Sequence, residues 1–214
     1  MEETMEMMFV FGLGNPGEKY EHTRHNAGRD AVLLFAKEHD ASWKMDSECT
    51  ARISNQFHVG AMPVRCAIPE TYMNNSGSAV RCAAERAPTT PTVVVVHDDI
   101  DLALGTVRVA KNKGAGGHNG VTDVIEHLGT KDFIRVRIGV IPTRADGSLR
   151  KPSAGEQILR FVLRSGNNKD AELLEKACAE AANALTLLCT MPYERAVEKI
   201  HRKNNERNRG AEVK

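Results

Sequence analysis

The chain has 214 residues, of which 41% are hydrophobic and 27% charged, and its formal net charge is +1. These values are typical of a globular chain with one sizeable core, and they argue against a generic, strongly basic nucleic-acid binder. The longest apolar runs, such as residues 31–36, are too short to cross a membrane. No membrane-spanning segment is therefore expected.

Five cysteines stand at positions 49, 66, 82, 178 and 189, without any C-x-x-C pair. A scattered, odd-numbered set of this kind predicts reduced thiols, with neither a zinc site nor a disulfide framework. The N-terminus, MEETME, is acidic and resembles neither a secretory signal nor a transit peptide. We expect a cytoplasmic protein, with an organelle as the alternative.

Charge is unevenly distributed along the chain. Residues 1–50 carry ten acidic and five basic side chains, residues 106–120 carry three basic side chains and no acid, and residues 199–214 carry six basic against two acidic ones. A basic face on a nearly neutral protein is one interpretation of this pattern. Ordinary solvated surface charge is the alternative for each residue taken singly.

Apolar runs alternate with polar, glycine-containing loops along the first two thirds of the chain. Strands are predicted at 7–13, 43–57, 62–68, 93–96, 104–110 and 133–138, with a turn at 58–61. Helices are predicted at 27–39, 78–86, 121–128, 156–163, 171–188 and 193–202, and residues 142–154 are predicted to form a loop.

This alternation predicts an α/β fold, a single three-layer α/β/α domain with a twisted, mixed and mostly parallel sheet and a helical C-terminal portion. We expect the domain to cover residues 1–203. The polar segment 204–214 is expected to be a disordered tail.

Gly12, Gly14 and Gly17 match the dinucleotide-binding pattern G-x-G-x-x-G. In a dinucleotide fold a helix begins at these glycines, so that its backbone amides meet the pyrophosphate. Residues 18–26 contain no aliphatic side chain that such a helix could bury, and Asn26 is a better candidate for the N-cap of the helix. A nicotinamide-dependent enzyme is therefore the weakest of the functional interpretations.

The polar loops offer histidines, aspartates and asparagines but no serine or cysteine in a G-x-S-x-G motif. A histidine oriented by an aspartate can activate water, and amide groups can hold a carbonyl and the oxyanion that it becomes. The set thus favours hydrolysis by an activated water over a covalent intermediate. The alternative for each residue is structural: Asp98 and Asp99 could cap a turn, and His118 could cap a helix.

Five motifs resemble, in order and spacing, those of the bacterial-type peptidyl-tRNA hydrolases. The motifs are GLGNPG with Tyr20 and TRHNAG (residues 12–28), TYMNNSG (71–77), HDDID (97–101), GGHNG (116–120) and RVRIG (135–139). The resemblance covers roughly residues 7–165.

This resemblance implies roles for individual residues. His25 would be the general base and Asp98 the group that orients its imidazole. Substrate would be bound by Asn15, Tyr20, Tyr72, Asn74 and Asn119. The implied reaction is hydrolysis of the ester between a peptide, or an N-blocked aminoacyl group, and the 3′ end of tRNA, without a cofactor or a metal. The helical C-terminal portion would form a flap over the groove.

The implied partner is peptidyl-tRNA, contacted at its acceptor region by a monomeric protein. Arg108, Lys113 and Arg137 are the predicted phosphate contacts. The family often has a lysine where Ala110 stands, so Lys111 or Lys113 would take its place. The alternative function is a catalytically inactive tRNA- or RNA-binding module of the same fold. Such a module would be expected to have lost His25 or Asp98, and both are present.

Overall fold

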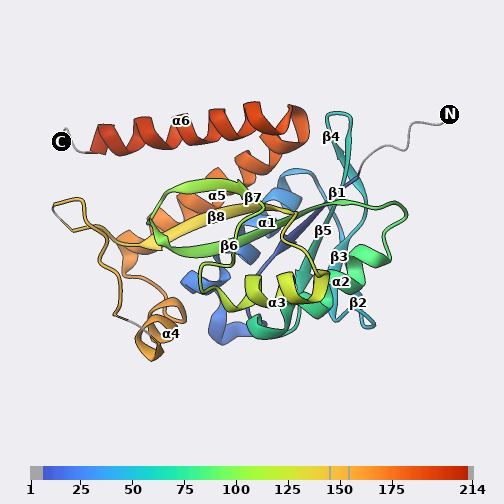
Figure 1. Ribbon diagram of the computed structural model, residues 1–214, viewed down its shortest axis with the longest axis horizontal. Helices are drawn as coiled ribbons and strands as arrows, with labels where there is room; N and C mark the ends of the chain where they lie inside the picture. The colour runs from blue at the N-terminus through green and yellow to red at the C-terminus, as the bar shows by residue number, and fades with distance from the viewer. Residues whose placement is uncertain (1–6, 145, 154, 212–214) are drawn as a thin grey trace.

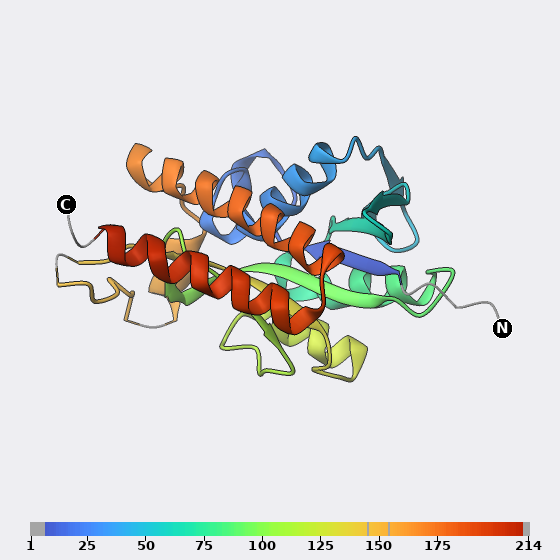
Figure 2. The same cartoon turned by 90° about the horizontal axis from the view of Figure 1, so that it is seen from above.

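A computed structural model describes residues 7–144, 146–153 and 155–211, and side chains only as far as residue 203. It shows a central sheet with helices on both faces (Figures 1 and 2). The strands are β1 (Met8–Gly12), β2 (Trp43–Asp46), β3 (Ala51–Ser54), β4 (Phe57–Val59), β5 (Met62–Pro69), β6 (Thr92–Ala103), β7 (Val107–Lys111) and β8 (Ile134–Ile141).

The strand order is β2-β3-β5-β1-β6-β8-β7, and β4 pairs with β5 outside this path. The four central strands, β5, β1, β6 and β8, are parallel to one another, whereas the outer strands pair antiparallel. The predicted α/β fold with a mixed sheet is confirmed. Because the central strands are parallel, their carboxyl ends open onto the same edge of the sheet.

The helices agree with the predicted ones in number and place, with ends that differ by a few residues. They are α1 (Ala27–Glu38), α2 (Ser76–Glu85), α3 (Asn119–Leu128), α4 (Glu156–Val162), α5 (Asn168–Thr190) and α6 (Tyr193–Ala211). There are also three short 3-10 helices. The first, η1 (Glu18–Tyr20), lies in the loop after β1, whereas η2 (Arg24–Asn26) and η3 (Met73–Asn75) lead directly into α1 and α2.

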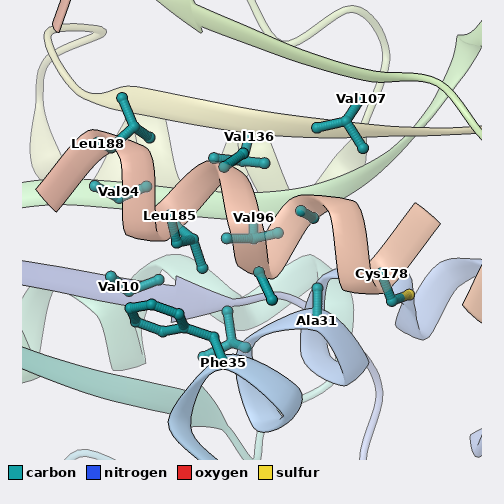
Figure 3. Close-up of a cluster of buried hydrophobic side chains, with 14 of the residues drawn as sticks. Val10, Ala31, Phe35, Val94, Val96, Val107, Val136, Cys178, Leu185 and Leu188 are labelled. Atoms are coloured by element: carbon teal, nitrogen blue, oxygen red, sulfur yellow. The ribbon is translucent and has the colours of Figure 1, made fainter. Parts of the chain in front are cut away.

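Two apolar layers hold the sheet between the helices. Alternate strand residues such as Val10, Val94 and Val136 face α1 and α5, where they meet Phe35 and Leu185 (Figure 3). The intervening residues, among them Phe9, Phe11 and Val95, face α2 and α3 in a second cluster. Side chains on a strand point alternately to its two faces, so β1 and β6 are apolar on both faces, as expected of central strands.

Two sequence-based predictions about elements are corrected. The single strand predicted over 43–57 is three short strands, because the chain turns after Asp46, whose Oδ1 accepts hydrogen bonds from the backbone N–H groups of Glu48 and Cys49. The tail expected from residue 204 continues as helix α6 to Ala211, where no proline interrupts the helix. Residues 212–214 lie outside the described part of the chain.

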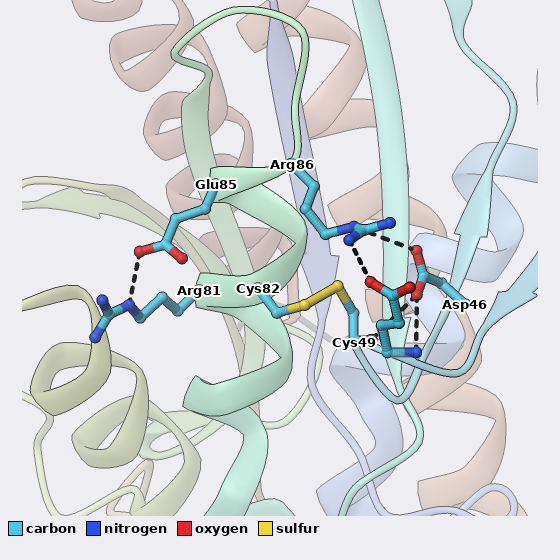
Figure 4. Close-up of a disulfide and its surroundings, with 7 residues drawn as sticks. Asp46, Cys49, Arg81, Cys82, Glu85 and Arg86 are labelled. Atoms are coloured by element: carbon cyan, nitrogen blue, oxygen red, sulfur yellow. Dashed lines mark hydrogen bonds and ion pairs between the residues drawn. A yellow bond between two sulfur atoms is a disulfide. The ribbon is translucent and has the colours of Figure 1, made fainter.

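The prediction of reduced thiols is wrong for two of the five cysteines. Cys49, in the turn between β2 and β3, forms a disulfide with Cys82 on α2 (Figure 4). The chain folds these two elements against each other, which sequence spacing does not reveal. Cys66, Cys178 and Cys189 are free and buried.

The part of the chain that the structure describes contains no helix that is both long enough and apolar enough to cross a membrane.

Candidate active site

His25 and Asp98 meet just beyond the carboxyl end of β1, beside the middle of β6. His25 lies in η2, in the loop that follows β1, and its Nδ1 is 2.9 Å from Oδ1 of Asp98. Both residues are almost fully buried, with 7% of His25 and 2% of Asp98 exposed. The structure thus brings together the pair that the resemblance implied, although they are 73 positions apart.

Close packing of α1 on β6 places η2 beside Asp98. Gly28, in the first turn of α1, lies so near β6 that a Cβ there would be 2.1 Å from the carbonyl oxygen of Val96 and 2.9 Å from Cα of His97. Only glycine permits this approach. The start of α1, and His25 just before it, are therefore held against the middle of β6, next to Asp98.

His118 is a third member of the cluster and was missed as a site residue in the sequence-based prediction. Its Nε2 lies 2.9 Å from the same Oδ1 of Asp98. As the N-cap of α3, His118 also accepts a hydrogen bond at Nδ1 from the backbone N–H of Val121. Nδ1 is thus an acceptor, so the proton of the neutral ring is on Nε2 and is donated to Asp98.

The electrostatics of the cluster keep Asp98 ionised. Burial acts to raise the pKa of Asp98, but the charges and hydrogen bonds of His25 and His118 outweigh it, and this pKa lies well below its usual range. An ionised carboxylate only accepts hydrogen bonds, so His25 donates from Nδ1 and its Nε2 is left unprotonated in the neutral ring. Nε2 is the nitrogen that can accept a proton from water.

The pKa of His25 is raised by the same pairing. Burial of the ring acts to lower it, but the charge and the hydrogen bond of Asp98 together outweigh burial. His97, next to Asp98 in sequence, differs: burial and the charge of His118 hold its pKa well below the usual value. The neutral His97 donates from Nδ1 to the backbone carbonyl of Asp98, at 2.6 Å, and so supports β6 at this point.

Asn15 belongs to a second group of predicted residues, linked to His25 through Asn26. Its backbone N–H donates to Oδ1 of Asn26, its carbonyl accepts from Nδ2 of Asn26, and its own Oδ1 accepts from the backbone N–H of Met73. The side chain of Asn26 thus binds the Asn15 loop and does not cap α1, the role predicted for it. Nδ2 of Asn15 has no hydrogen-bond partner among the described residues.

Asn74 and the two tyrosines lie near this group. Asn74 is exposed in η3, immediately after Met73, while the rings of Tyr20 and Tyr72 contact edge to face with centroids 6.5 Å apart. Tyr72 is 59% exposed, which is unusual for a large aromatic side chain. Gly120 of α3 packs on Met73, so Asn74 and the exposed Asn119 come from adjoining elements.

A cleft of about 460 Å³ lies between the His25–Asp98 pair and α4. Of the predicted site residues, it brings together His25, Asp98 and Asn119, whereas Asn15, Tyr20, Tyr72 and Asn74 do not line it. Its apolar wall is formed by Ile100, Ile158, Leu159 and Val162. The last three belong to α4, so of the helical C-terminal portion it is α4 that flanks the cleft.

The predicted phosphate contacts lie on β7, β8 and the loop before α3. Arg108 and Arg137 are direct partners across β7 and β8, and Nε of Arg137 donates to Oδ2 of Asp99 at 2.7 Å. Burial and the charge of Arg137 lower the pKa of Arg108. Lys111 is paired with Asp132 at 3.2 Å, whereas the exposed Lys113 has no ion-pair partner within the described residues.

His25, Asp98 and His118 also offer ligand atoms within 4.8 Å of one another, as a metal site would require. Hydrogen bonds already occupy Nδ1 of His25 and both nitrogens of His118. A metal ion bound through Nδ1 of His25 or Nε2 of His118 would need that nitrogen deprotonated and turned from Asp98, and binding through Nδ1 of His118 would break its hydrogen bond from Val121. The arrangement therefore suits proton transfer better than metal binding, and the absence of a metal stays a prediction.

The sequence of this chain is similar to members of one protein family. The sequence matches the family described as peptidyl-tRNA hydrolase over residues 9–208. A peptidyl-tRNA hydrolase of Shouchella clausii is 36% identical over 188 residues, covering 87% of this chain and 96% of that protein. One of Mycobacteroides abscessus is 35% identical over 197 residues, covering 92% and 95%.

Solved structures agree with the sequence comparison. The crystal structure of peptidyl-tRNA hydrolase from Acinetobacter baumannii superimposes with a TM-score of 0.79 at 28% identity, covering 94% of this chain and 97% of that one. A complex of a peptidyl-tRNA hydrolase with N-propanol also gives a TM-score of 0.79, at 29% identity, over 91% of this chain and 94% of that chain.

Proposed function

The chain belongs to the peptidyl-tRNA hydrolase family, enzymes that hydrolyse the ester joining a peptide to tRNA, and we propose that His25 performs this reaction by activating a water molecule. The observation that carries the proposal is the 2.9 Å hydrogen bond between Nδ1 of His25 and Asp98 at the edge of a cleft. It leaves Nε2 of His25 without a partner within the described residues.

In the first step, Nε2 of His25 accepts a proton from water while the water oxygen attacks the ester carbonyl carbon. The charge of Asp98 stabilises the imidazolium that forms, and His118 helps to hold that carboxylate in place. The carbonyl oxygen becomes an oxyanion. Nδ2 of Asn15 and the amide groups of Asn74 and Asn119 are the donors available to stabilise it.

In the second step, the tetrahedral intermediate expels the 3′ ribose oxygen of the tRNA. The imidazolium of His25 returns its proton to this oxygen, so the products are a free carboxylic acid and a tRNA hydroxyl, and His25 is neutral again. No electron transfer and no covalent bond to the enzyme are needed. This balance agrees with the described residues that line the cleft, which include no serine or cysteine nucleophile.

The two ends of the substrate would occupy different surfaces. The peptide would lie along the apolar wall formed by Ile100, Ile158 and Leu159, with Asn119 at its polar side. The acceptor end of the tRNA would extend toward Arg108, Lys113 and Arg137, with Tyr20 and Tyr72 available for stacking on its terminal bases. Since one chain supplies both surfaces, we propose that the enzyme acts as a monomer in the compartment where translation takes place, the cytoplasm.

The test is incubation with an N-acetylated aminoacyl-tRNA and measurement of released acyl amino acid and free tRNA. We expect equal amounts of both products, formed in proportion to the enzyme. An inactive RNA-binding module would bind the substrate and release neither product. The bonded His25–Asp98 pair favours the enzyme over this alternative.

A further inference from the structure

Arg24, immediately before His25, points away from the reacting groups and into the junction between α4 and α5. It is 6% exposed although arginine is rarely buried. Its Nη1 donates to the backbone carbonyl of Arg164 at 3.1 Å, and its Nη2 donates to Oδ2 of Asp170 at 3.0 Å. The guanidinium carbon also lies 4.3 Å from the centre of the Phe161 ring.

These contacts join η2 to α4, to the linker after it and to the first turn of α5. Asp170 is itself fixed, because its backbone N–H donates to Oδ1 of Asn167, the N-cap of α5. Gly166 allows the linker to pass close by: a Cβ there would be 3.1 Å from Nη2 of Arg24 and 2.5 Å from Cβ of Asp170. The backbone is thus shaped around the guanidinium.

Helix α4 depends on such an attachment. It has seven residues, of which only Val162 is buried, and its main packing contact is with η2. Helices this short are not stable on their own in water, so tertiary contacts must fix α4. Figure 1 shows α4 standing apart from the layers of the domain. The same helix supplies Ile158, Leu159 and Val162 to the cleft beside His25.

We propose that Arg24 is a positioning residue that anchors α4 on η2, so that the apolar wall of the cleft stands beside the general base. The inference rests on the proposed function, because the wall is assigned to the peptide part of that substrate. Arg24 itself touches neither the water nor the ester. Its effect reaches the substrate through Phe161 and the α4–α5 linker.

The first arm of the test measures hydrogen exchange of the backbone amides of α4 in the purified, folded protein. Arg24→Ala and Asp170→Asn should both speed exchange in residues 156–162 while leaving the central strands protected. Asp170→Asn keeps the shape of the side chain and lies far from His25 in sequence, so it serves if Arg24→Ala does not fold. Unchanged exchange of α4 in a folded Asp170→Asn variant, or in a folded Arg24→Ala variant, would overturn the anchor.

The matched control is Arg160→Ala, on α4 itself. Arg160 pairs with Glu156 at 3.0 Å, but both side chains are mostly exposed, and exposed pairs of this kind contribute little. Exchange of α4 should therefore stay close to that of the unaltered protein. Equal loss of protection in Arg160→Ala and Arg24→Ala would mean that any lost charge loosens α4, and the anchor would be rejected.

The second arm compares two substrates, a tRNA carrying a short apolar peptide and one carrying a single N-acetylated amino acid. Arg24→Ala should raise KM for the peptide-bearing tRNA on the order of tenfold, because losing the charged hydrogen bonds of Arg24 would release α4 and, with it, the apolar wall. The change for the single amino acid should be smaller, and the pH profile of kcat should not move. Arg24→Lys should recover part of the loss.

An equal fall in kcat on both substrates would instead mean that Arg24 only supports the position of His25, which contradicts the proposed role. If the unaltered protein released product from neither substrate, the proposed function would fail. The exchange measurement would still decide whether Arg24 anchors α4.

Discussion

Asp98 raises the pKa of His25, so replacing Asp98 should change how activity depends on pH. A base must be neutral to accept a proton, so if His25 is the base, as proposed, activity should rise as pH rises through the pKa of His25. Asp98 raises that pKa. Asp98→Asn removes the charge, so the acidic limb of the pH–rate profile should move to lower pH, while kcat falls by roughly 100-fold or more.

Asp132→Asn is the matched control, because Asp132 is exposed and pairs with Lys111 away from the cleft. Its pH profile should coincide with that of the unaltered enzyme. An Asp98→Asn variant with an unshifted acidic limb would show that Asp98 has only a structural role within β6.

Among individual residues, the motifs predicted more of the candidate site than the residue types alone could. The resemblance implied His25 beside Asp98, and the structure has them in hydrogen-bond contact, although their catalytic roles stay predictions. The predicted site did not include His118, although this residue belongs to the GGHNG motif. A role as the N-cap of a helix was a sufficient explanation for it, and His118 is indeed the N-cap of α3. The two hydrogen bonds between the side chain of Asn26 and the backbone of Asn15 depend on the conformation of the loop, which the spacing of residues in the sequence does not reveal.

Among the elements, the contact of α1 with β6 governs where His25 stands. A side chain at position 28 would meet the carbonyl of Val96, so Gly28→Ala should force α1 and β6 apart. We expect a loss of at least about 2 kcal/mol in the free energy of unfolding, measured by urea denaturation, as for other overpacked sites. Gly114→Ala, where a Cβ would meet nothing within 4 Å, should have almost no effect on stability. Equal stability of the two variants would refute the close packing.

The disulfide between the β2–β3 turn and α2 is a second link between elements, separated by 33 positions in sequence. Arg86 adds ion pairs to Asp46 and Glu48 across the same junction (Figure 4). Closing a loop of this length stabilises a fold by roughly 3–4 kcal/mol in the chain-entropy account. Replacing Cys49 and Cys82 together by alanine should therefore lower Tm. Neither cysteine lines the cleft, so kcat/KM should not change.

Dithiothreitol provides the control for this pair. It should lower the Tm of the unaltered protein toward that of the double variant and leave the variant unchanged. A Tm indifferent to the reductant, with five titratable thiols after unfolding, would mean that the cysteines are not bonded in solution.

Helices and central strands could be predicted because their apolar periodicity is local. The division of residues 43–57 into three strands could not, since it follows from a turn that Asp46 stabilises and from pairing with β5. Strand β6 extends to Ala103, past the apolar run that predicted it, because β8 pairs with it beyond Asp98. Partners distant in the sequence decide such boundaries.

The net charge of the whole molecule is only +1, so the electrostatic attraction of tRNA should depend on a few local basic residues. A few phosphate contacts from Arg108, Lys113 and Arg137 should give a shallow dependence of affinity on salt, with a log–log slope on the order of two to four. Arg137→Ala and Lys113→Ala should each reduce the slope by about one unit and raise KM more than they lower kcat. Arg81→Ala, an exposed arginine on α2 paired with Glu85, is the control and should leave the slope unchanged.

A slope that neither Arg137→Ala nor Lys113→Ala alters would place the phosphate contacts elsewhere, most simply on the basic end of α6. Deleting residues 204–214 separates the two cases. The slope should remain if the contacts lie on β7, β8 and the loop before α3, and it should fall if they lie on α6.

In the proposed mechanism, His25 activates the water that cleaves the ester. This step is tested most directly by single-turnover hydrolysis of N-acetylated aminoacyl-tRNA, with binding of the same substrate measured in parallel. For His25→Ala we expect hydrolysis slower by roughly 10²–10⁴-fold, the range for loss of a general base, with substrate affinity retained. A folded His25→Ala variant that hydrolyses the ester at the unaltered rate would contradict this mechanism.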